Sequence, residues 1–221
     1  GQDTIIVSAT DIDGNPRPNP AGSNPDMGAH ENAFAEPRVP IAIYVPDDYS
    51  NIESAVNVAV DRDTIYVRAG NYDDPVYIDS KDIHLIGVEG APLTQLTSGY
   101  ISIHNSDVQV RGFTIRDANR GVSVRDGSTA ILEHLIIESS NQEALQILEG
   151  STAMISDVVV DSARFGIKVS HNANATIQNC TITNCTDVGI SVRDTSGALF
   201  MNCVVWNNGS SINYLTNNHI D

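Results

Sequence analysis

The chain has 221 residues, of which 41% are hydrophobic, 18% charged and 5% aromatic, enough for one domain with a substantial core. Its formal net charge is −16, so the phosphates of nucleic acids and anionic membrane surfaces are excluded as partners. No stretch approaches the roughly 20 consecutive apolar residues of a membrane span, so membrane insertion is not expected.

Residues 1–43 are expected to form an extended segment that precedes the folded domain. The run Ile5, Ile6 and Val7 favours a strand that can be added to the sheet of another molecule. Proline-rich stretches at residues 16–25 and 36–40 indicate extended linkers. We therefore interpret this segment as a donated cap with its linker.

A possible calcium site lies within the same segment. Asp11, Asp13 and Asn15 alternate along the chain, and their oxygen atoms are the ligands that Ca²⁺ prefers, with Asp26 or Glu31 as further ligands. The distal glutamate of an EF-hand is absent, and Asp and Asn also form ordinary turns. A simple turn is therefore the favoured interpretation and no cofactor is expected, with Ca²⁺ as the one alternative that the sequence suggests.

Residues 44–221 are expected to form an all-β domain that begins with a capping helix near residues 50–60. Ser50 is predicted as the N-cap, because Glu53 follows three residues later. The expected buried face of this helix contains Ile52, Ala55, Val56 and Val60. Strands are predicted next at residues 64–67, 76–78, 82–86 and 100–103. The helix would then cover the open end of the first coil.

The second half of the chain consists of five repeats of 22 or 23 residues. Within each repeat apolar residues alternate in two short runs, which is the period of strands rather than of helices. The repeats are residues 108–129, 130–152, 153–174, 175–197 and 198–219. This period, with Gly, Asn, Ser or Asp in the turns, predicts a parallel β-helix with one coil per repeat. A leucine-rich repeat would need a signature that is absent.

Equivalent residues of the repeats form columns that are predicted to point into the core, stacked about 4.8 Å apart. The five columns are Val110, Leu132, Ile155, Ile177 and Phe200; Phe113, Leu135, Val158, Cys180 and Cys203; Ile115, Ile137, Val160, Ile182 and Val205; Val122, Leu145, Ile167, Ile190 and Ile212; and Val124, Ile147, Val169, Val192 and Tyr214. The extra residue of the longer repeats is expected in the turn before Ala144 and Gly189.

The three cysteines do not form a disulfide framework or a zinc pattern. Cys180 and Cys203 share an inward column on adjacent coils, which places them within disulfide range. Two stacked free thiols are the commoner outcome of such a pair and a bridge is the alternative, and Cys185 is expected in a turn column. Asn179 and Asn202 are predicted to stack outside the core as a short amide ladder.

Residues 44–56 and 61–72 resemble the opening of pectin-lyase-like right-handed β-helix proteins. In that superfamily a short helix caps the N-terminal end, and a Gly-x-Tyr sequence, here Gly70-Asn71-Tyr72, leads into the first coil. With the repeats, the resemblance covers residues 44–221 and implies a right-handed parallel β-helix. It implies no single function, because the superfamily includes lyases, hydrolases, esterases, epimerases, adhesins and phage tailspikes.

Residues 11–18 and 25–31 resemble the closing segment of secreted bacterial β-helix proteins of the choice-of-anchor Q type. In those proteins the motif follows the last coil, whereas here it precedes the first. This resemblance implies an extracellular or cell-surface location.

Enzymes of the superfamily usually act from the side of the solenoid through charged residues on neighbouring coils. Two outward columns contain such residues: Arg116, Glu138 and Asp161 in one, and Arg111 and Glu133 in the other. Glu138 and Asp161 are weak candidates for acid–base catalysis on a glycan, with a cation such as Lys168 lowering one pKa. The alternative is an exposed charge ladder. Because the motifs of polygalacturonases, pectin esterases and pectate lyases are absent, no acid–base or metal-dependent hydrolase centre is expected.

Two classes of function fit this sequence. In the favoured one the protein is an extracellular structural subunit that self-associates head-to-tail into a fibre or sheath. Residues 1–40 would cap the open last coil of a neighbour, where Ile220 begins a further coil, and capping of the same chain is the alternative geometry. The other class is a polysaccharide-processing lyase, hydrolase or epimerase, or a glycan-binding module of a larger secreted protein, with an extracellular polysaccharide as partner.

Overall fold

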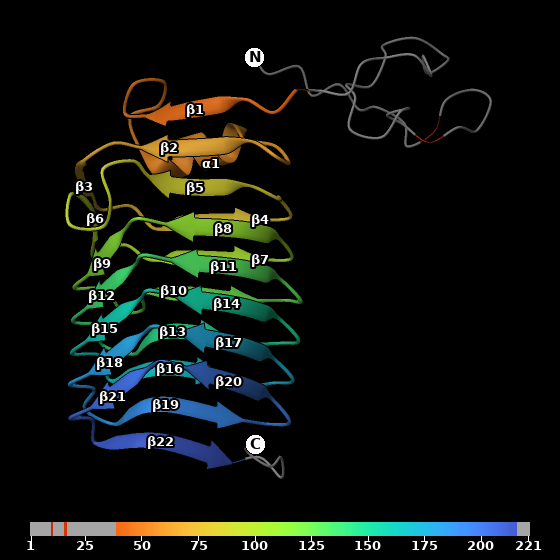
Figure 1. Cartoon of the computed structure of the whole chain (residues 1–221). Coiled ribbons are helices and arrows are strands. Elements are labelled where there is room, and N and C mark those ends of the chain that lie inside the picture. Colours follow the sequence, from red (N-terminus) through yellow and green to blue (C-terminus); the bar gives the residue numbers. More distant parts are fainter. Residues whose placement is uncertain (1–9, 11–15, 17–38, 216–221) are drawn as a thin grey trace. The chain divides into compact units, whose positions relative to one another are not determined.

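The structure is a computed structural model that describes Thr10, Pro16 and residues 39–215, with the backbone alone for residues 213–215. The chain divides into two units, residues 1–40 and 41–221, and all named helices and strands belong to the second. That unit is a parallel β-helix in which successive coils contribute strands to three sheets (Figure 1). The parallel β-helix predicted from the repeats is therefore confirmed.

Within each sheet, neighbouring strands come from successive coils and pair in parallel. The first sheet contains, in spatial order, β1 (Ala42–Val45), β2 (Thr64–Val67), β5 (His84–Gly87), β8 (Asp107–Arg111), β11 (Thr129–Glu133), β14 (Thr152–Ser156), β17 (Asn174–Gln178) and β20 (Gly197–Met201). The second contains β3 (Gly70–Tyr72), β6 (Thr94–Thr97), β9 (Thr114–Arg116), β12 (Ile136–Glu138), β15 (Val159–Asp161), β18 (Thr181–Thr183) and β21 (Val204–Trp206). The third contains β4 (Val76–Asp79), β7 (Ile101–His104), β10 (Val122–Arg125), β13 (Glu143–Ile147), β16 (Phe165–Val169), β19 (Val188–Arg193) and β22 (Ser210–Leu215).

The strand register confirms four of the five predicted columns, and the fifth, from Phe113 to Cys203, lies between the strands of the first and second sheets. The column on the second sheet, for example, pairs Ile115, Ile137, Val160, Ile182 and Val205 in that order. In the first four repeats all column members are buried. In the fifth repeat Phe200, Cys203 and Val205 are only half-buried and Ile212 is exposed, because no further coil of the described chain covers them.

The extra residue of the 23-residue repeats lies in a turn, as predicted. Glu138 pairs with Asp161, and Glu143 pairs with Phe165, so the turn between the paired positions holds one residue more in the longer coil. The register on both sides of the turn is unchanged, which is why the insertion does not disturb the core columns.

The turns between sheets repeat one backbone conformation from coil to coil. A positive φ of 53° to 58° follows each strand of the second sheet from β9 onward, at Asp117, Ser139, Ser162, Asn184 and Asn207. A second column with positive φ follows the first sheet, at Gly112, His134, Asp157, Asn179 and Asn202. Gly, Asn and Asp adopt this left-handed conformation at the lowest cost, which explains the polar composition of the turns.

The helix α1 (Ile52–Val58) packs against β1, β2 and β4, and its buried side chains are Ile52, Ala55 and Val56. At its C-terminal end Lys81 Nζ donates to the carbonyl oxygens of Val56 at 2.6 Å and Asn57 at 3.0 Å, which satisfies two terminal acceptors. The predicted capping helix is thus present. In residues 39–215 no helix is long and apolar enough to cross a membrane.

Two details of the predicted helix are wrong. The N-cap is Asn51 and not Ser50, because the Asn51 side chain accepts a hydrogen bond from the Ser54 backbone N–H at 2.8 Å. Glu53 does not complete a capping box with Ser50, since its carboxylate accepts from a backbone N–H of β4. Val60 lies beyond the last helical residue and is exposed rather than part of the buried face.

The strands between the helix and the repeats also differ in part from prediction. The strand expected at residues 82–86 begins only at His84. Three strands, β1, β3 and β6, were not predicted. β3 and β6 contain few apolar residues, and β1 lies between Pro40 and Pro46, which made its residues resemble a linker.

Candidate functional site

The two predicted catalytic carboxylates are neighbours, but each has its own partner. Glu138 and Asp161 are register partners at the ends of β12 and β15. The guanidinium of Arg116 lies 3.5 Å from Glu138 Oε2. Asp161 accepts hydrogen bonds from Asn184 Nδ2 at 2.5 Å and from Ser162 Oγ at 2.9 Å. These contacts fit an exposed charge ladder better than an acid–base pair.

Lys168, the third predicted residue, lies on another sheet. It belongs to β16 of the third sheet, and its Nζ lies 3.1 Å from Glu143 Oε1. Arg120 Nε approaches the other oxygen of the same carboxylate at 3.2 Å. The structure thus brings Lys168 to Glu143 and Arg120, two residues that the sequence analysis did not single out.

Glu143 is held as a carboxylate by this pair of cations. Its side chain is only 8% exposed, and burial alone would raise its pKa. The hydrogen bonds and charges of Lys168 and Arg120 outweigh burial, so the pKa of Glu143 lies below its usual range. A small hollow of about 40 Å³ adjoins the carboxylate, lined by Glu143, Phe165, Lys168, Ser191 and Arg193. A carboxylate stabilised in its charged form serves as an ion-pair partner and is a poor proton donor.

A signal for this cluster is present in the repeat alignment. Arg120 stands two residues before Val122, and Glu143 stands two residues before Leu145, so the two charges belong to one column. Opposite charges in one column of adjacent coils predict an ion pair. An alignment that compares only apolar residues does not detect such a pair.

The other predicted site residues lie outside the described residues: Ile5, Ile6, Val7, Asp11, Asp13, Asn15, Asp26 and Ile220. The strand donation and the calcium site that these residues suggest stay predictions. In the described part of the chain no group of three or more His, Cys, Asp or Glu side chains is arranged to hold a metal ion.

The three cysteines are free thiols, so Cys180 and Cys203 are not bridged. Burial raises the pKa values of Cys180 and Cys185 to about 11, which keeps both protonated at neutral pH. The predicted amide ladder is present, since Asn202 Nδ2 donates to Asn179 Oδ1 at 3.2 Å.

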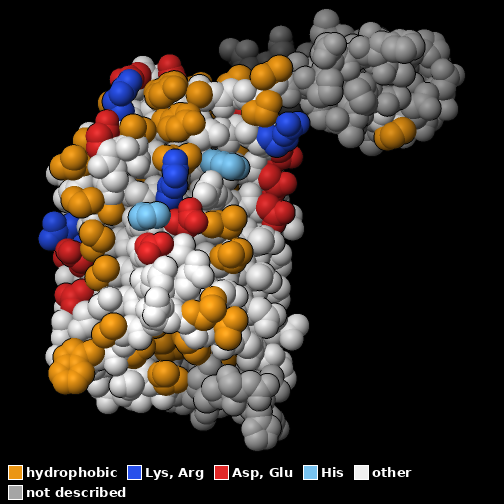
Figure 2. Space-filling view, in the orientation of Figure 1, with side chains coloured by type: hydrophobic (Ala, Val, Ile, Leu, Met, Phe, Trp, Pro, Cys, Tyr) orange, Lys and Arg blue, Asp and Glu red, His pale blue; other side chains and the backbone are white. Residues whose placement is uncertain are grey.

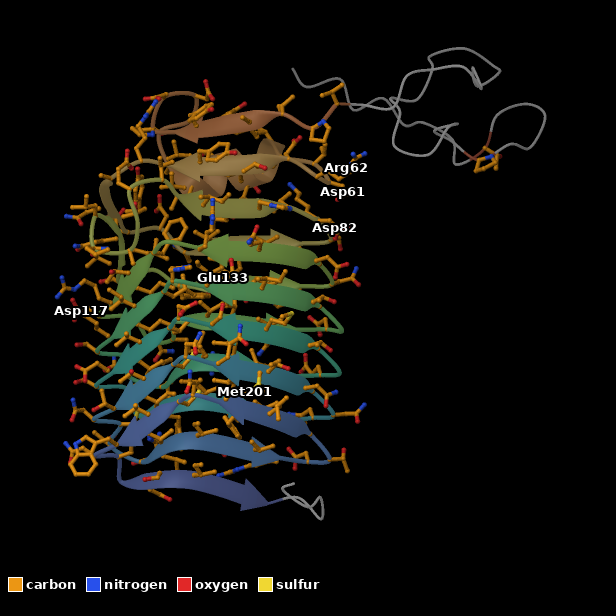
Figure 3. All side chains as sticks on the ribbon, in the orientation of Figure 1. Asp61, Arg62, Asp82, Asp117, Glu133 and Met201 are labelled. Atoms are coloured by element: carbon orange, nitrogen blue, oxygen red, sulfur yellow. The ribbon has the colours of Figure 1, made fainter. Side chains whose placement is uncertain are left out.

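The outward face of the first sheet changes in character along the solenoid. Arg111 and Glu133 are register partners on β8 and β11, as predicted. The same column reaches Met201 on β20, and Figure 3 shows Glu133 and Met201 on this face. In Figure 2 the charged side chains lie mainly over the upper coils, whereas the lower coils carry hydrophobic and neutral ones.

The last described coil exposes many apolar side chains. Its strands β20, β21 and β22 are each the outermost strand of a sheet. Their exposed fractions are 54% for Leu199, 42% for Met201, 56% for Val204, 71% for Trp206 and 45% for Ile212. Within the described chain these strands have neighbours on one side only, so a further strand can add to the other edge.

The comparisons with known proteins support the fold and no particular activity. A family model described as right handed beta helix region matches residues 99–220, more than half of the chain. No curated protein and no solved structure matches the sequence significantly. The match contains the five repeats and adds the right-handed sense that the pectin-lyase-like resemblance implied. The chain belongs to the family of right-handed β-helix proteins.

Proposed function

We propose that this β-helix is an extracellular structural subunit that assembles head-to-tail into a fibre or sheath. The observation that carries the proposal is the contrast between the two ends of the described coils. At the first coil α1 buries three apolar side chains. At the last coil apolar side chains stay exposed, and Phe200, Cys203 and Val205 of the inward columns are half-buried.

The proposed occupant of the last coil is the segment of residues 1–40 of a second copy. The run Ile5-Ile6-Val7 in this segment has the length and composition of a short edge strand. A strand added to β20, β21 or β22 would cover exposed apolar surface. Such a contact joins two different surfaces, so it repeats in an open filament and does not close as a dimer. The net charge of −16 opposes unspecific lateral association of such filaments.

The test compares the full chain with a variant that lacks residues 1–40. We expect filaments of the full chain in negative-stain microscopy and only monomers of the truncated protein, with unchanged circular dichroism. An excess of a peptide of residues 1–40 should stop elongation. Filaments of the truncated protein, or a full chain that stays monomeric at high concentration by light scattering, would show that the proposal is wrong.

A matched pair of substitutions tests the last coil directly. Val159 and Val204 belong to one outward column on the second sheet, with Thr181 between them, and both are exposed. Only Val204 lies on an outermost strand. Lysine on an edge strand opposes addition of another strand, so Val204→Lys should reduce elongation strongly and Val159→Lys should leave it unchanged. Equal effects of the two variants would contradict docking at this edge.

A further inference from the structure

A serine, a histidine and an aspartate are connected on the outward face of the third sheet. Ser102 Oγ lies 2.8 Å from His104 Nε2, and His104 Nδ1 lies 2.8 Å from Asp126 Oδ2. Ser102 and His104 are two residues apart on β7, so both side chains point to the same side of the strand. Asp126 follows β10 of the next coil and has a positive φ of 59°.

The two imidazole nitrogens have different partners, which defines a direction for proton transfer. An ionised Asp126 accepts the Nδ1–H of His104, so Nε2 is left as the acceptor for the Ser102 hydroxyl. Hydrogen bonds with Glu149 and His104 lower the pKa of Asp126, which favours this ionised form. This is the order of contacts in which a histidine acts as a base on a serine nucleophile.

A similar group on later coils lacks this geometry. Ser170 Oγ lies 3.1 Å from His171 Nδ1, but His171 Nε2 is 3.8 Å from Asp194 Oδ2, too far for a hydrogen bond. The carboxylate therefore does not orient this second imidazole. The comparison shows that the arrangement at Ser102 does not arise automatically wherever Ser, His and Asp meet on this solenoid.

Ser102 is largely covered by its neighbours, and His104 is the more exposed member of the pair. Only 6% of the surface of Ser102 is exposed, whereas 30% of the His104 side chain and 50% of the Asp126 side chain are, so a substrate has to approach from the side of the imidazole. Tyr100 immediately precedes β7 and lines, with Asn119 and Arg120, a hollow of about 80 Å³. This hollow lies at the start of β7, and Ser102, His104 and Asp126 do not line it.

We propose that Ser102, His104 and Asp126 form a catalytic triad that hydrolyses carboxylic esters. Ser102 Oγ attacks the ester carbonyl carbon while His104 Nε2 takes the hydroxyl proton. The bond to the alcohol oxygen then breaks, and Nε2 returns the proton to the leaving alcohol. Water, deprotonated by Nε2, attacks the acyl-serine, and Ser102 Oγ is released and reprotonated. The net reaction converts an ester and water into a carboxylic acid and an alcohol.

The test uses the intact chain with p-nitrophenyl acetate as substrate and a fluorophosphonate as covalent probe. We expect one probe molecule per chain, located at Ser102 by peptide mass spectrometry. Ser102→Ala should abolish labelling, and Asp126→Asn should slow ester hydrolysis about 100-fold, because the imidazole loses the partner that sets its tautomer.

Ser123→Ala is the matched control for the nucleophile. Ser123 is the register partner of Ser102 on β10, is similarly buried, and accepts a hydrogen bond from Gln146 rather than facing a histidine. Labelling and hydrolysis should be unchanged in this variant, and circular dichroism should be the same for all variants. Absence of probe at Ser102, or equal hydrolysis by Ser102→Ala and the unchanged chain, would overturn the proposal.

Discussion

Glu143 is a carboxylate that the protein almost completely encloses. Because its folded pKa lies below the ordinary value of 4.5, it stabilises the fold above that pH and loses this contribution as the pH falls through the folded pKa. Glu143→Gln removes the charge and leaves Lys168 and Arg120 without it, so we expect a loss of about 1–2 kcal/mol in the free energy of unfolding at pH 7.

The pH dependence separates this charge effect from a packing effect. Urea unfolding at pH 7 and at pH 3.5 should show a smaller difference between Glu143→Gln and the unchanged protein at the lower pH. A difference that is the same at both pH values would mean that shape and not charge makes Glu143 important.

Ile182 tests the core at a single position. It is fully buried between Val160 and Val205 in its column. Ile182→Asp would bury a carboxylate without a partner. We therefore expect the free energy of unfolding to fall by at least about 3 kcal/mol, or the variant to fail to fold. Thr181→Asp is the control, because Thr181 is the preceding residue of β18 and points outward. Thermal unfolding of both variants checks the prediction, and similar stability of the two would contradict the register.

At the scale of the element, α1 allows a direct test of the corrected N-cap. The Asn51 side chain satisfies the Ser54 N–H, so Asn51→Ala should lower the free energy of unfolding by about 1 kcal/mol. Ser50→Ala should change it by less than half of that, since Ser50 lies outside the cap. Chemical denaturation of the two variants measures the difference. A larger loss of stability for Ser50→Ala than for Asn51→Ala would show instead that Ser50 is the N-cap, as the sequence predicted.

The coil is the second unit at this scale, and its tolerance of 22 or 23 residues has a simple cause. Parallel strands need a common register only where they pair, and the extra residue lies in a turn where it breaks no ladder hydrogen bond of the core sheets. From β8 onward residues with positive φ terminate the strands at the same places in each coil, so an insertion stays local.

At the scale of the whole molecule, the reactivity of Cys203 measures whether the last coil is covered. It is half-buried, whereas Cys180 and Cys185 are buried and have pKa values raised to about 11. In the monomer iodoacetamide should therefore label Cys203 first, as measured by mass spectrometry of native protein. If residues 1–40 of a neighbour cover the last coil, labelling of Cys203 should fall at least several-fold in the assembled material. Unchanged labelling on assembly would place the contact elsewhere.

The repeats, the five apolar columns and the capping helix could all be predicted from the sequence, because each depends on a regular spacing of apolar residues. A residue such as Ile182 is buried for the same local reason as Val160 and Val205, namely its place in the alternation. The N-cap was misplaced by one residue, since Ser50 and Asn51 are both good capping residues and only the backbone geometry distinguishes them.

Only the tertiary structure decided which residues meet around Glu143 and His104. Arg120, Glu143 and Lys168 are more than 20 residues apart along the chain and become neighbours because coils stack in one register. His104 and Asp126 likewise meet across two coils, and their hydrogen bond depends on the positive φ at Asp126. Spacing along one strand determines burial, whereas contacts between charged side chains depend on the turn geometry and the rotamers of two coils at once. For this reason the sequence alone predicted the core and the Asn179–Asn202 ladder, but not the clusters around Glu143 and His104.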